Sequence, residues 1–345
     1  MSVVWSCSEW DPLAEVVVGT PQNAKYPTAD KSAQFVVFPE RPLDSLPTGD
    51  FSARVLSETE EDLSKLVNVL QQQGITVRRP EPPDNHRTFS TTHWKAQGFH
   101  CYCPRDILTV IGDVIIESPN AMRSRFFESF AYRPILLDYL KSGARWVGAP
   151  KPMLLDSLYE PSGVAERVLK NDEPVFDAAN ILRCGYDLLF LVSSTGNELG
   201  AQWLQQTLGT KYKVHLVKDV YYGSHIDSTF AMLRPGLVLC NPARVNESNF
   251  PPLLKKWKAI YSPPMVPGAL CGIDPIGSDW IGMNLLSLSP NLVVVEKEQV
   301  PLIKLLERQG LDVIPLSLRH GRLLGGGFHC VTLDVRRKGT MENYF

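Results

Sequence analysis

The sequence lacks an excess of positive charge and any long apolar run. Among its 345 residues, 35 Lys and Arg stand against 37 Asp and Glu, which gives a formal net charge of −2. Without a polybasic cluster, neither nucleic acid nor a membrane is an expected partner. The longest apolar runs, such as residues 188–192 and 292–295, have the length of strands and are far too short to span a bilayer. The N-terminal residues show no basic region followed by an apolar one, so no secretory signal is expected.

Two nucleotide-binding signatures are also missing. No G-x-G-x-x-G follows the first predicted strand, and no G-x-x-x-x-G-K-[ST] occurs, so neither a dinucleotide site nor a P-loop is expected. The glycines at 325–327 are not followed by the lysine that a phosphate loop requires. We therefore expect no cofactor.

The seven cysteines form an odd set without a repeated spacing. Such a set predicts reduced thiols in a cytoplasmic protein rather than a disulfide framework. His100, Cys101 and Cys103 resemble half of a metal site, but no second Cys or His pair lies at the spacing that zinc requires. No metal is therefore expected.

One unit recurs along the chain: an amphipathic helix, a glycine that ends it and an apolar strand. The first copy is predicted as a helix over residues 57–73, begun by a capping box of Ser57 and Glu60, followed by Gly74 and a strand over 75–79. Further copies are predicted at 197–217 and 301–315, with a weaker one at 252–261. Separate strands are predicted at 16–18, 108–116, 188–192, 237–240 and 292–295.

The alternation of helices and strands predicts an α/β fold. Repeats of this size indicate one unit copied around an axis or along a solenoid. No segment has the composition of a flexible linker, so residues 1–345 are predicted to form a single domain. Charged segments at 103–106, 224–227 and 327–330 follow successive units, so in a closed ring they would meet near the axis and form one central site.

The candidate catalytic residues lie in three segments. Cys330 follows the glycines at 325–327, and a backbone without side chains would leave its thiol open to a substrate. His225 and Asp227 are two residues apart, which places them on one side of an extended segment. Asp177 lies between apolar residues, where an unpaired carboxylate would be costly. The structural alternatives are a core cysteine for Cys330, a structural histidine for His225, and a helix cap or a structural hydrogen bond for Asp177.

These groups suit chemistry at a guanidine carbon. A guanidinium is planar, cationic and resonance-stabilised, so its carbon is a poor electrophile. Attack requires a thiolate, carboxylates that hold the cation in one plane, and an acid that protonates the leaving amine. Cys330 is the predicted nucleophile, and a cation bound beside it would favour its ionisation. His225 is the predicted general acid and base.

Segments spread over nearly the whole chain resemble the amidinotransferases, the arginine:glycine and arginine:inosamine-phosphate enzymes of the guanidino-modifying superfamily. The segments that carry the resemblance are residues 9–13, 102–106, 149–152, 174–179, 225–227, 241–242, 325–330 and 334–337. The resemblance implies a five-bladed α/β propeller of ββαβ modules around a central channel, which agrees with the repeats.

The resemblance also implies a ping-pong reaction. Cys330 attacks the guanidine carbon of L-arginine, His225 protonates the departing ornithine, and an acceptor amine then attacks the amidino-cysteine while His225 takes its proton. Asp177 is expected to orient His225 and to help hold the guanidinium. The remaining four residues are expected to bind the donor. Asp106 and Asp227 would bind its guanidinium nitrogens, and Arg244 and Ser278 would bind its carboxylate.

The acceptor is predicted from shorter matches. Residues 19–30 and 196–201 look most like the inosamine-phosphate enzymes of aminoglycoside antibiotic biosynthesis, so an aminocyclitol phosphate is the expected acceptor. An amino acid such as glycine or lysine is the alternative, although residues 222–224 replace the Asn-Pro-Met-like segment of the glycine-using enzymes. The only expected partners are these small molecules, and a homodimer is left open.

Two other functions are alternatives to amidino transfer. Deiminases let water attack the intermediate, and they tend to carry Glu-Gly-Gly where this chain has residues 177–179, so transfer is favoured over hydrolysis. A catalytically silent arginine-binding protein is the other alternative, and it is disfavoured because Cys330, His225 and Asp177 are all present.

Overall fold

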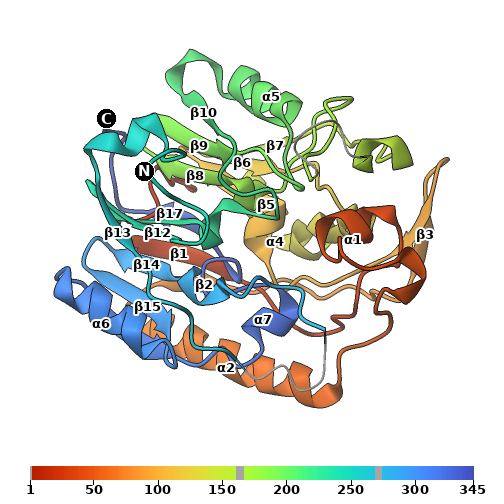
Figure 1. Cartoon of the computed structure of the whole chain (residues 1–345), viewed down its shortest axis with the longest axis horizontal. Helices are drawn as coiled ribbons and strands as arrows, with labels where there is room; N and C mark the ends of the chain where they lie inside the picture. The colour runs from red at the N-terminus through yellow and green to blue at the C-terminus, as the bar shows by residue number, and fades with distance from the viewer. Residues whose placement is uncertain (1, 161–166, 269–273) are drawn as a thin grey trace.

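The computed structural model describes residues 2–160, 167–268 and 274–345 (Figure 1). This part of the chain contains five three-stranded sheets and one two-stranded sheet, interspersed with helices, so the predicted α/β class is confirmed. No helix in the described residues combines the length and the apolar character that a membrane span requires.

The five larger sheets share one plan, in which a central strand pairs antiparallel with one neighbour and parallel with the other. Because a parallel pair needs a crossover, the connection to the parallel strand carries a helix in each case. In sheet order the strands are β17 (Thr332–Arg337), β1 (Leu13–Val18) and β2 (Thr76–Arg78); β5 (Leu108–Ile111), β6 (Val114–Glu117) and β7 (Arg145–Gly148); β8 (Ile181–Cys184), β9 (Asp187–Leu191) and β10 (Lys213–Val217); β11 (Phe230–Arg234), β12 (Leu237–Cys240) and β13 (Lys258–Tyr261); β14 (Leu286–Ser289), β15 (Leu292–Glu296) and β16 (Asp312–Leu316).

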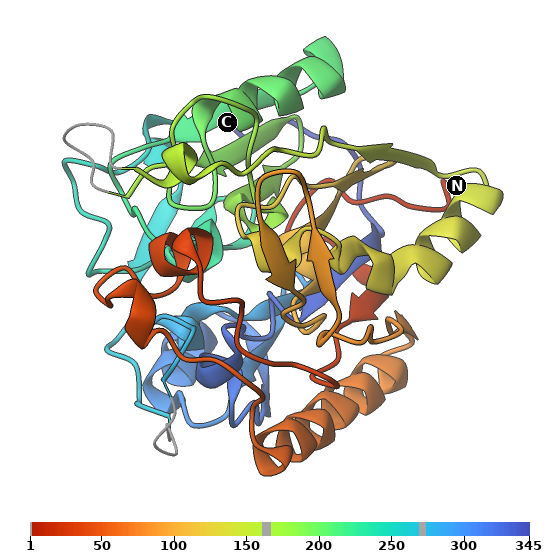
Figure 2. The same cartoon turned by 90° about the vertical axis from the view of Figure 1, so that its right-hand side faces the viewer.

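The crossover helices lie outside the sheets, as the two views of the molecule show (Figures 1 and 2). They are α2 (Ala53–Gln72), α4 (Arg133–Lys141), α5 (Glu198–Leu208), the 3-10 helix η8 (Pro252–Lys256) and α6 (Val300–Arg308). The remaining elements are short: α1 (Lys31–Val36), α3 (Pro104–Ile107), α7 (Gly321–Leu324), the hairpin of β3 (Thr88–Ser90) and β4 (Lys95–Gln97), and the 3-10 turns η1 (Leu43–Ser45), η2 (Arg123–Arg125), η3 (Glu128–Tyr132), η4 (Asp156–Tyr159), η5 (Ala178–Asn180), η6 (Gly209–Lys211), η7 (Ile226–Ser228) and η9 (Ile281–Met283).

The predicted helices at 197–208 and 301–309 are confirmed within a residue or two by α5 and α6. Asn197 caps α5, because its side chain accepts from the backbone N–H of Gly200. The positive φ of Gly74 and of Gly310, +75° and +77°, confirms that glycine follows the ends of α2 and α6.

Three details of the predicted elements are wrong. Helix α2 begins at Ala53, and Ser52 is its N-cap residue. Ser57 lies inside the helix, where its hydroxyl donates to the carbonyl of Arg54. The predicted strand over 108–116 is the hairpin β5–β6, which turns at Gly112 with a φ of +57°. The weak helix near 252–258 is the short 3-10 helix η8, with proline in its first turn.

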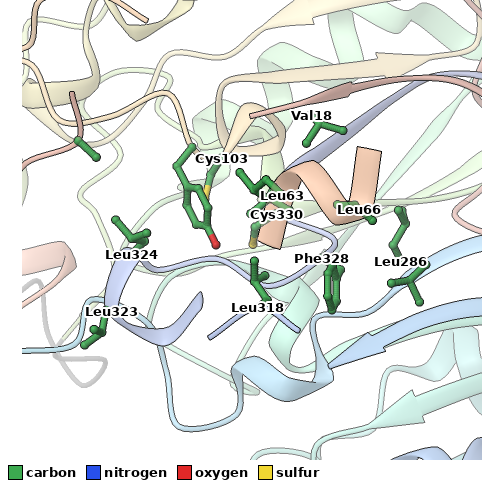
Figure 3. Packing of buried hydrophobic residues seen from close by; sticks show 14 of the residues in the cluster. Val18, Leu63, Leu66, Cys103, Leu286, Leu318, Leu323, Leu324, Phe328 and Cys330 are labelled. Atoms are coloured by element: carbon green, nitrogen blue, oxygen red, sulfur yellow. The ribbon is translucent and has the colours of Figure 1, made fainter. Parts of the chain in front are cut away.

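A buried apolar cluster supports the segment that carries Cys330 (Figure 3). Leu63 and Leu66 of α2 have no exposed surface and pack beside Val18 of β1 and Phe328. Each buried leucine contributes on the order of 1.5–3 kcal/mol to stability. The turn between α7 and β17, which ends at Cys330, therefore rests on a close-packed base.

Candidate active site

Six of the seven residues expected to act in the chemistry line one pocket. These six are Asp106, Asp177, His225, Asp227, Ser278 and Cys330. The seventh, Arg244, lies directly behind the wall, because its Nη2 donates to Oγ of Ser278 at 2.7 Å. Short helical turns and loops hold all seven, so the sheets act as the frame and the connections carry the polar groups.

Cys330 lies in the turn before β17 and is held by a single asparagine. Its backbone N–H donates to Oδ1 of Asn284 at 2.9 Å, and Nδ2 of the same side chain donates to the thiol at 3.1 Å. The Cys103 thiol, burial and the Asp227 carboxylate raise the pKa of Cys330 well above its usual value. The thiol is therefore protonated when no cation is bound.

The glycines before Cys330 serve a different purpose from the one expected. A Cβ on Gly326 would lie 2.5 Å from Sγ of Cys103 and 3.0 Å from Cβ of Cys330, and one on Gly327 would lie 2.6 Å from Cβ of Asn284. The space is thus taken by the protein's own side chains rather than kept open for a substrate. Glycine is required here because Cys103 and Asn284 pack directly against the backbone.

His225 and Asp177 form a close pair in the pocket. Nε2 of His225 lies 2.9 Å from Oδ2 of Asp177, and Nδ1 lies 3.5 Å from Oδ1 of Asp106. The other oxygen of Asp177 accepts from Nδ2 of Asn120 and from the backbone N–H of Ala121. Asp177 is therefore not a side-chain helix cap, although it directly precedes η5.

The electrostatics of this pair favour a charged imidazole. Burial lowers the pKa of His225, but the carboxylates of Asp106 and Asp177 outweigh that effect and hold the pKa well above its usual value. Burial raises the pKa of Asp177, yet its hydrogen bond to His225 leaves that pKa below the usual value. A protonated His225 beside an ionised Asp177 can donate a proton to a leaving amine.

The predicted extended segment around His225 is wrong. His225 has a φ of +51°, in the left-handed region that side chains rarely adopt, and residues 226–228 form the 3-10 turn η7. The turn still brings His225 and Asp227 into the same pocket. His225 and Asp227 thus lie in one pocket as expected, but a strained turn brings them there instead of the alternation of side chains along a strand.

Asp106 and Asp227 both line the pocket that contains the Cys330 thiol. Oδ2 of Asp106 accepts from Nη1 of Arg125 at 2.7 Å, whereas its Oδ1 is buried, has no hydrogen bond and lies 3.5 Å from Nδ1 of His225. Oδ2 of Asp227 accepts from the Cys330 thiol at 3.2 Å and from Nδ1 of His329 at 2.9 Å. A buried acceptor without a donor is costly, so Oδ1 of Asp106 is suited to an N–H group that enters with a ligand.

Arg244 is a cation surrounded by neutral groups. Its Nη1 donates to the carbonyl and hydroxyl of Ser228 and to Oγ1 of Thr229, and its guanidinium carbon lies 3.5 Å above the centre of the Tyr221 ring. No acid among the described residues forms an ion pair with it. Burial lowers the pKa of Arg244, and an entering carboxylate would offset that burial.

Several residues of the site were missed in the sequence. His329 has each ring nitrogen against a carboxylate, Nδ1 at 2.9 Å from Asp227 and Nε2 at 3.1 Å from Glu9. Glu9 in turn pairs with the buried Arg183 at 2.8 Å. The only available signal was position, because His329 directly precedes Cys330 and Glu9 opens a segment used in the family resemblance.

The same groups include residue types that bind metals. The ligand atoms of Asp106, His225 and Cys330 lie within 4.8 Å of one another. That separation is at the limit for ligands roughly 2.0–2.3 Å from one ion. Arg125 already pairs with Asp106, and Asp177 with His225, so the cluster suits a planar cation that bridges its oxygens better than a metal ion.

Comparison with known proteins gives close relatives over the whole chain, although no family model matches it. The chain is 53% identical to inosamine-phosphate amidinotransferase 1 of Streptomyces glaucescens, covering 100% of this chain and 99% of that protein. It is 37% identical to the mitochondrial glycine amidinotransferase of Xenopus tropicalis, covering 99% of this chain and 85% of that protein. The solved structure of the inosamine-phosphate amidinotransferase StrB1 from Streptomyces griseus matches with a TM-score of 0.96 at 51% identity, covering 100% and 99%.

Proposed function

The chain belongs to the amidinotransferases, as its motifs predicted, and we propose that it transfers the amidino group of L-arginine to an amine and releases L-ornithine. The observation that carries this proposal is the arrangement of Cys330 beside the His225–Asp177 pair in one pocket. We also propose that residues 1–345 form one domain, in which the five sheets are the blades of an α/β propeller. Their shared plan supports this arrangement.

In the first half of the reaction, the guanidinium of arginine lies between the carboxylates of Asp106 and Asp227. Its N–H groups satisfy the free Oδ1 of Asp106, and its positive charge lowers the pKa of Cys330, so that the thiol proton is released to solvent. The arginine carboxylate binds Arg244 and Ser278. The substrate thereby creates the nucleophile that attacks it.

The thiolate of Cys330 then forms a bond to the guanidine carbon. His225, which is charged, gives its proton to the nitrogen that leaves with ornithine, and the C–N bond breaks. An amidino-cysteine remains, with a neutral His225 beside it. Asp177 keeps the imidazole in place through both steps, since its other oxygen is fixed by Asn120 and the backbone of Ala121.

In the second half, the acceptor amine attacks the same carbon from the space that ornithine leaves. His225 takes the proton of the amine, the bond to Sγ breaks, and the guanidino product departs while the thiolate of Cys330 returns. The imidazole ends the cycle charged, as it began. Water performing the same attack on the amidino-cysteine would give urea. In the deiminase alternative, ammonia instead of ornithine leaves in the first half, and water then releases citrulline.

We propose that the acceptor is an aminocyclitol phosphate in an antibiotic pathway. The support is the 53% identity over the full chain to an enzyme named for inosamine phosphate, against 37% to the glycine enzyme. Glycine or lysine is the second candidate acceptor.

The test is mass spectrometry of the products formed from arginine alone and with glycine, lysine, an inosamine phosphate or the unphosphorylated inosamine. We expect ornithine together with a guanidino inosamine phosphate, and an enzyme adduct one amidino group heavier before the acceptor is added. A guanidino amino acid would replace the proposed acceptor. Citrulline formed without an acceptor would overturn transfer itself.

A further inference from the structure

Arg167 is a cation near the pocket whose charge has no partner among the described residues. It forms no ion pair there, its Nε is buried without a hydrogen bond, and its single contact is Nη2 at 3.5 Å from the carbonyl of Phe35. Burial lowers the pKa of Arg167, and the Tyr221 phenol and the exposed Glu40 act on it only electrostatically. A half-buried guanidinium with almost all of its donors unused is an expensive feature without a ligand.

The position of Arg167 connects it to the active site by two routes. Phe35 belongs to α1, and the next two residues, Val36 and Val37, line the pocket that contains Cys330. Tyr221 interacts electrostatically with Arg167, and its ring stacks on the Arg244 guanidinium. Arg167 therefore lies close to the side of the pocket that α1 forms.

Three other guanidinium groups around this pocket are already paired with acids in the described part of the chain. Arg125 binds Asp106 and Glu128, and Arg123 binds Asp156. Arg41, whose carbonyl accepts from Gln34 of α1, pairs with Asp274 at 2.5 Å. Arg244 has no acid, but the proposed mechanism uses it for the arginine carboxylate. Arg167 is thus a guanidinium near the pocket that, among the described residues, has no acid and can take a second anion.

We infer that Arg167 binds the phosphate group of the acceptor. This inference rests on the proposed function, in which the acceptor is a phosphorylated aminocyclitol that enters after ornithine leaves. A guanidinium offers parallel N–H donors that match phosphate oxygens, and a half-buried site strengthens such charge-assisted hydrogen bonds. The phosphate would supply the missing partner of Arg167 and direct the opposite end of the ring, with its amine, toward the amidino-cysteine.

The test compares two acceptors, an inosamine phosphate and the same inosamine without phosphate, in the wild-type enzyme and in Arg167→Gln. We expect kcat/KM for the phosphorylated acceptor to fall by about ten- to a hundredfold, as the loss of charged hydrogen bonds implies, while kcat/KM for the unphosphorylated one stays the same. The release of one equivalent of ornithine from arginine, measured without acceptor, should be unchanged. Arg167→Lys should restore part of the preference for phosphate.

Arg41→Gln is the matched control, because it removes a guanidinium near the same helix whose charge is already paired. We expect the preference for phosphate to persist in it. Equal losses with both acceptors in Arg167→Gln, or an unchanged preference, would overturn the inference while leaving amidino transfer intact. A wild-type enzyme that releases ornithine but uses no inosamine phosphate would overturn both this inference and the proposed acceptor.

Discussion

The thiol of Cys330 donates a hydrogen bond to Oδ2 of Asp227 across 3.2 Å. This contact stabilises the protonated thiol, and it would set a thiolate directly against a carboxylate. A guanidinium placed between the Cys330 sulfur and the Asp227 carboxylate would instead stabilise the thiolate. We therefore expect the Cys330 thiol to be poorly reactive at neutral pH without a ligand, and to become reactive when the proposed cationic donor binds.

Cys330→Ala is expected to abolish ornithine release, because Cys330 is the one cysteine among the described residues that lines the pocket beside His225. The measurement is ornithine formed from arginine in a single turnover without acceptor. Cys7→Ala is the control, since Cys7 is also buried but lies outside the pocket. Normal turnover in Cys330→Ala would contradict the covalent mechanism.

Asp227→Asn is expected to make Cys330 ionise at lower pH. The carboxylate of Asp227 raises the pKa of Cys330, so its removal brings that pKa back toward the usual value. Alkylation of Cys330 by iodoacetamide, followed by peptide mass spectrometry, should therefore begin at lower pH in the variant than in the wild type. The variant should at the same time bind arginine more weakly. An unchanged alkylation profile would show that Asp227 does not control the thiol.

The sequence predicted the residues of the site better than their geometry. Cys330, His225 and Asp177 were found because their chemistry stands out in short segments. The partners that hold them were not, since Asn284 and Cys330 are 46 residues apart and Glu9 and His329 are 320 apart. Such contacts depend on how the sheets are placed relative to one another, and local patterns carry no information about that.

The repeats show the same limit. Helices α2, α5 and α6 were visible because each buries one apolar face and ends at glycine or close to it. Strands β8, β11 and β14 were overlooked, as was the α4–β7 pair. These strands are short and mostly buried, so they lack the alternation of apolar and polar residues that marks a half-exposed strand.

Gly326→Ala is expected to lower activity strongly, and Cys103→Ala is expected to restore part of it. The added Cβ would lie 2.5 Å from Sγ of Cys103 and 3.0 Å from Cβ of Cys330, so it must displace the nucleophile or its neighbour. The double variant removes the sulfur and makes room. The measurement is kcat/KM for arginine in the two single variants and the double variant. Gly148→Ala, where a Cβ meets no atom within 4 Å, is the control. Equal activity in Gly326→Ala and the wild type would contradict the packing argument.

Arg244→Ala is expected to weaken the use of arginine through its carboxylate. The guanidinium is fixed by Ser228, Thr229 and Ser278 and has no acid of its own among the described residues, so its truncation removes the partner of a buried anion. The expected loss in kcat/KM for arginine is about 2–5 kcal/mol, mostly as a higher KM. The decarboxylated analogue agmatine gives the sharper comparison, because it cannot use Arg244: the wild-type enzyme should strongly prefer arginine, and the variant should lose that preference. Arg234→Ala, which removes a guanidinium bound to the carbonyl of Gln309 outside the pocket, should keep the preference. An unchanged dependence on arginine concentration in Arg244→Ala would assign the donor carboxylate to another residue.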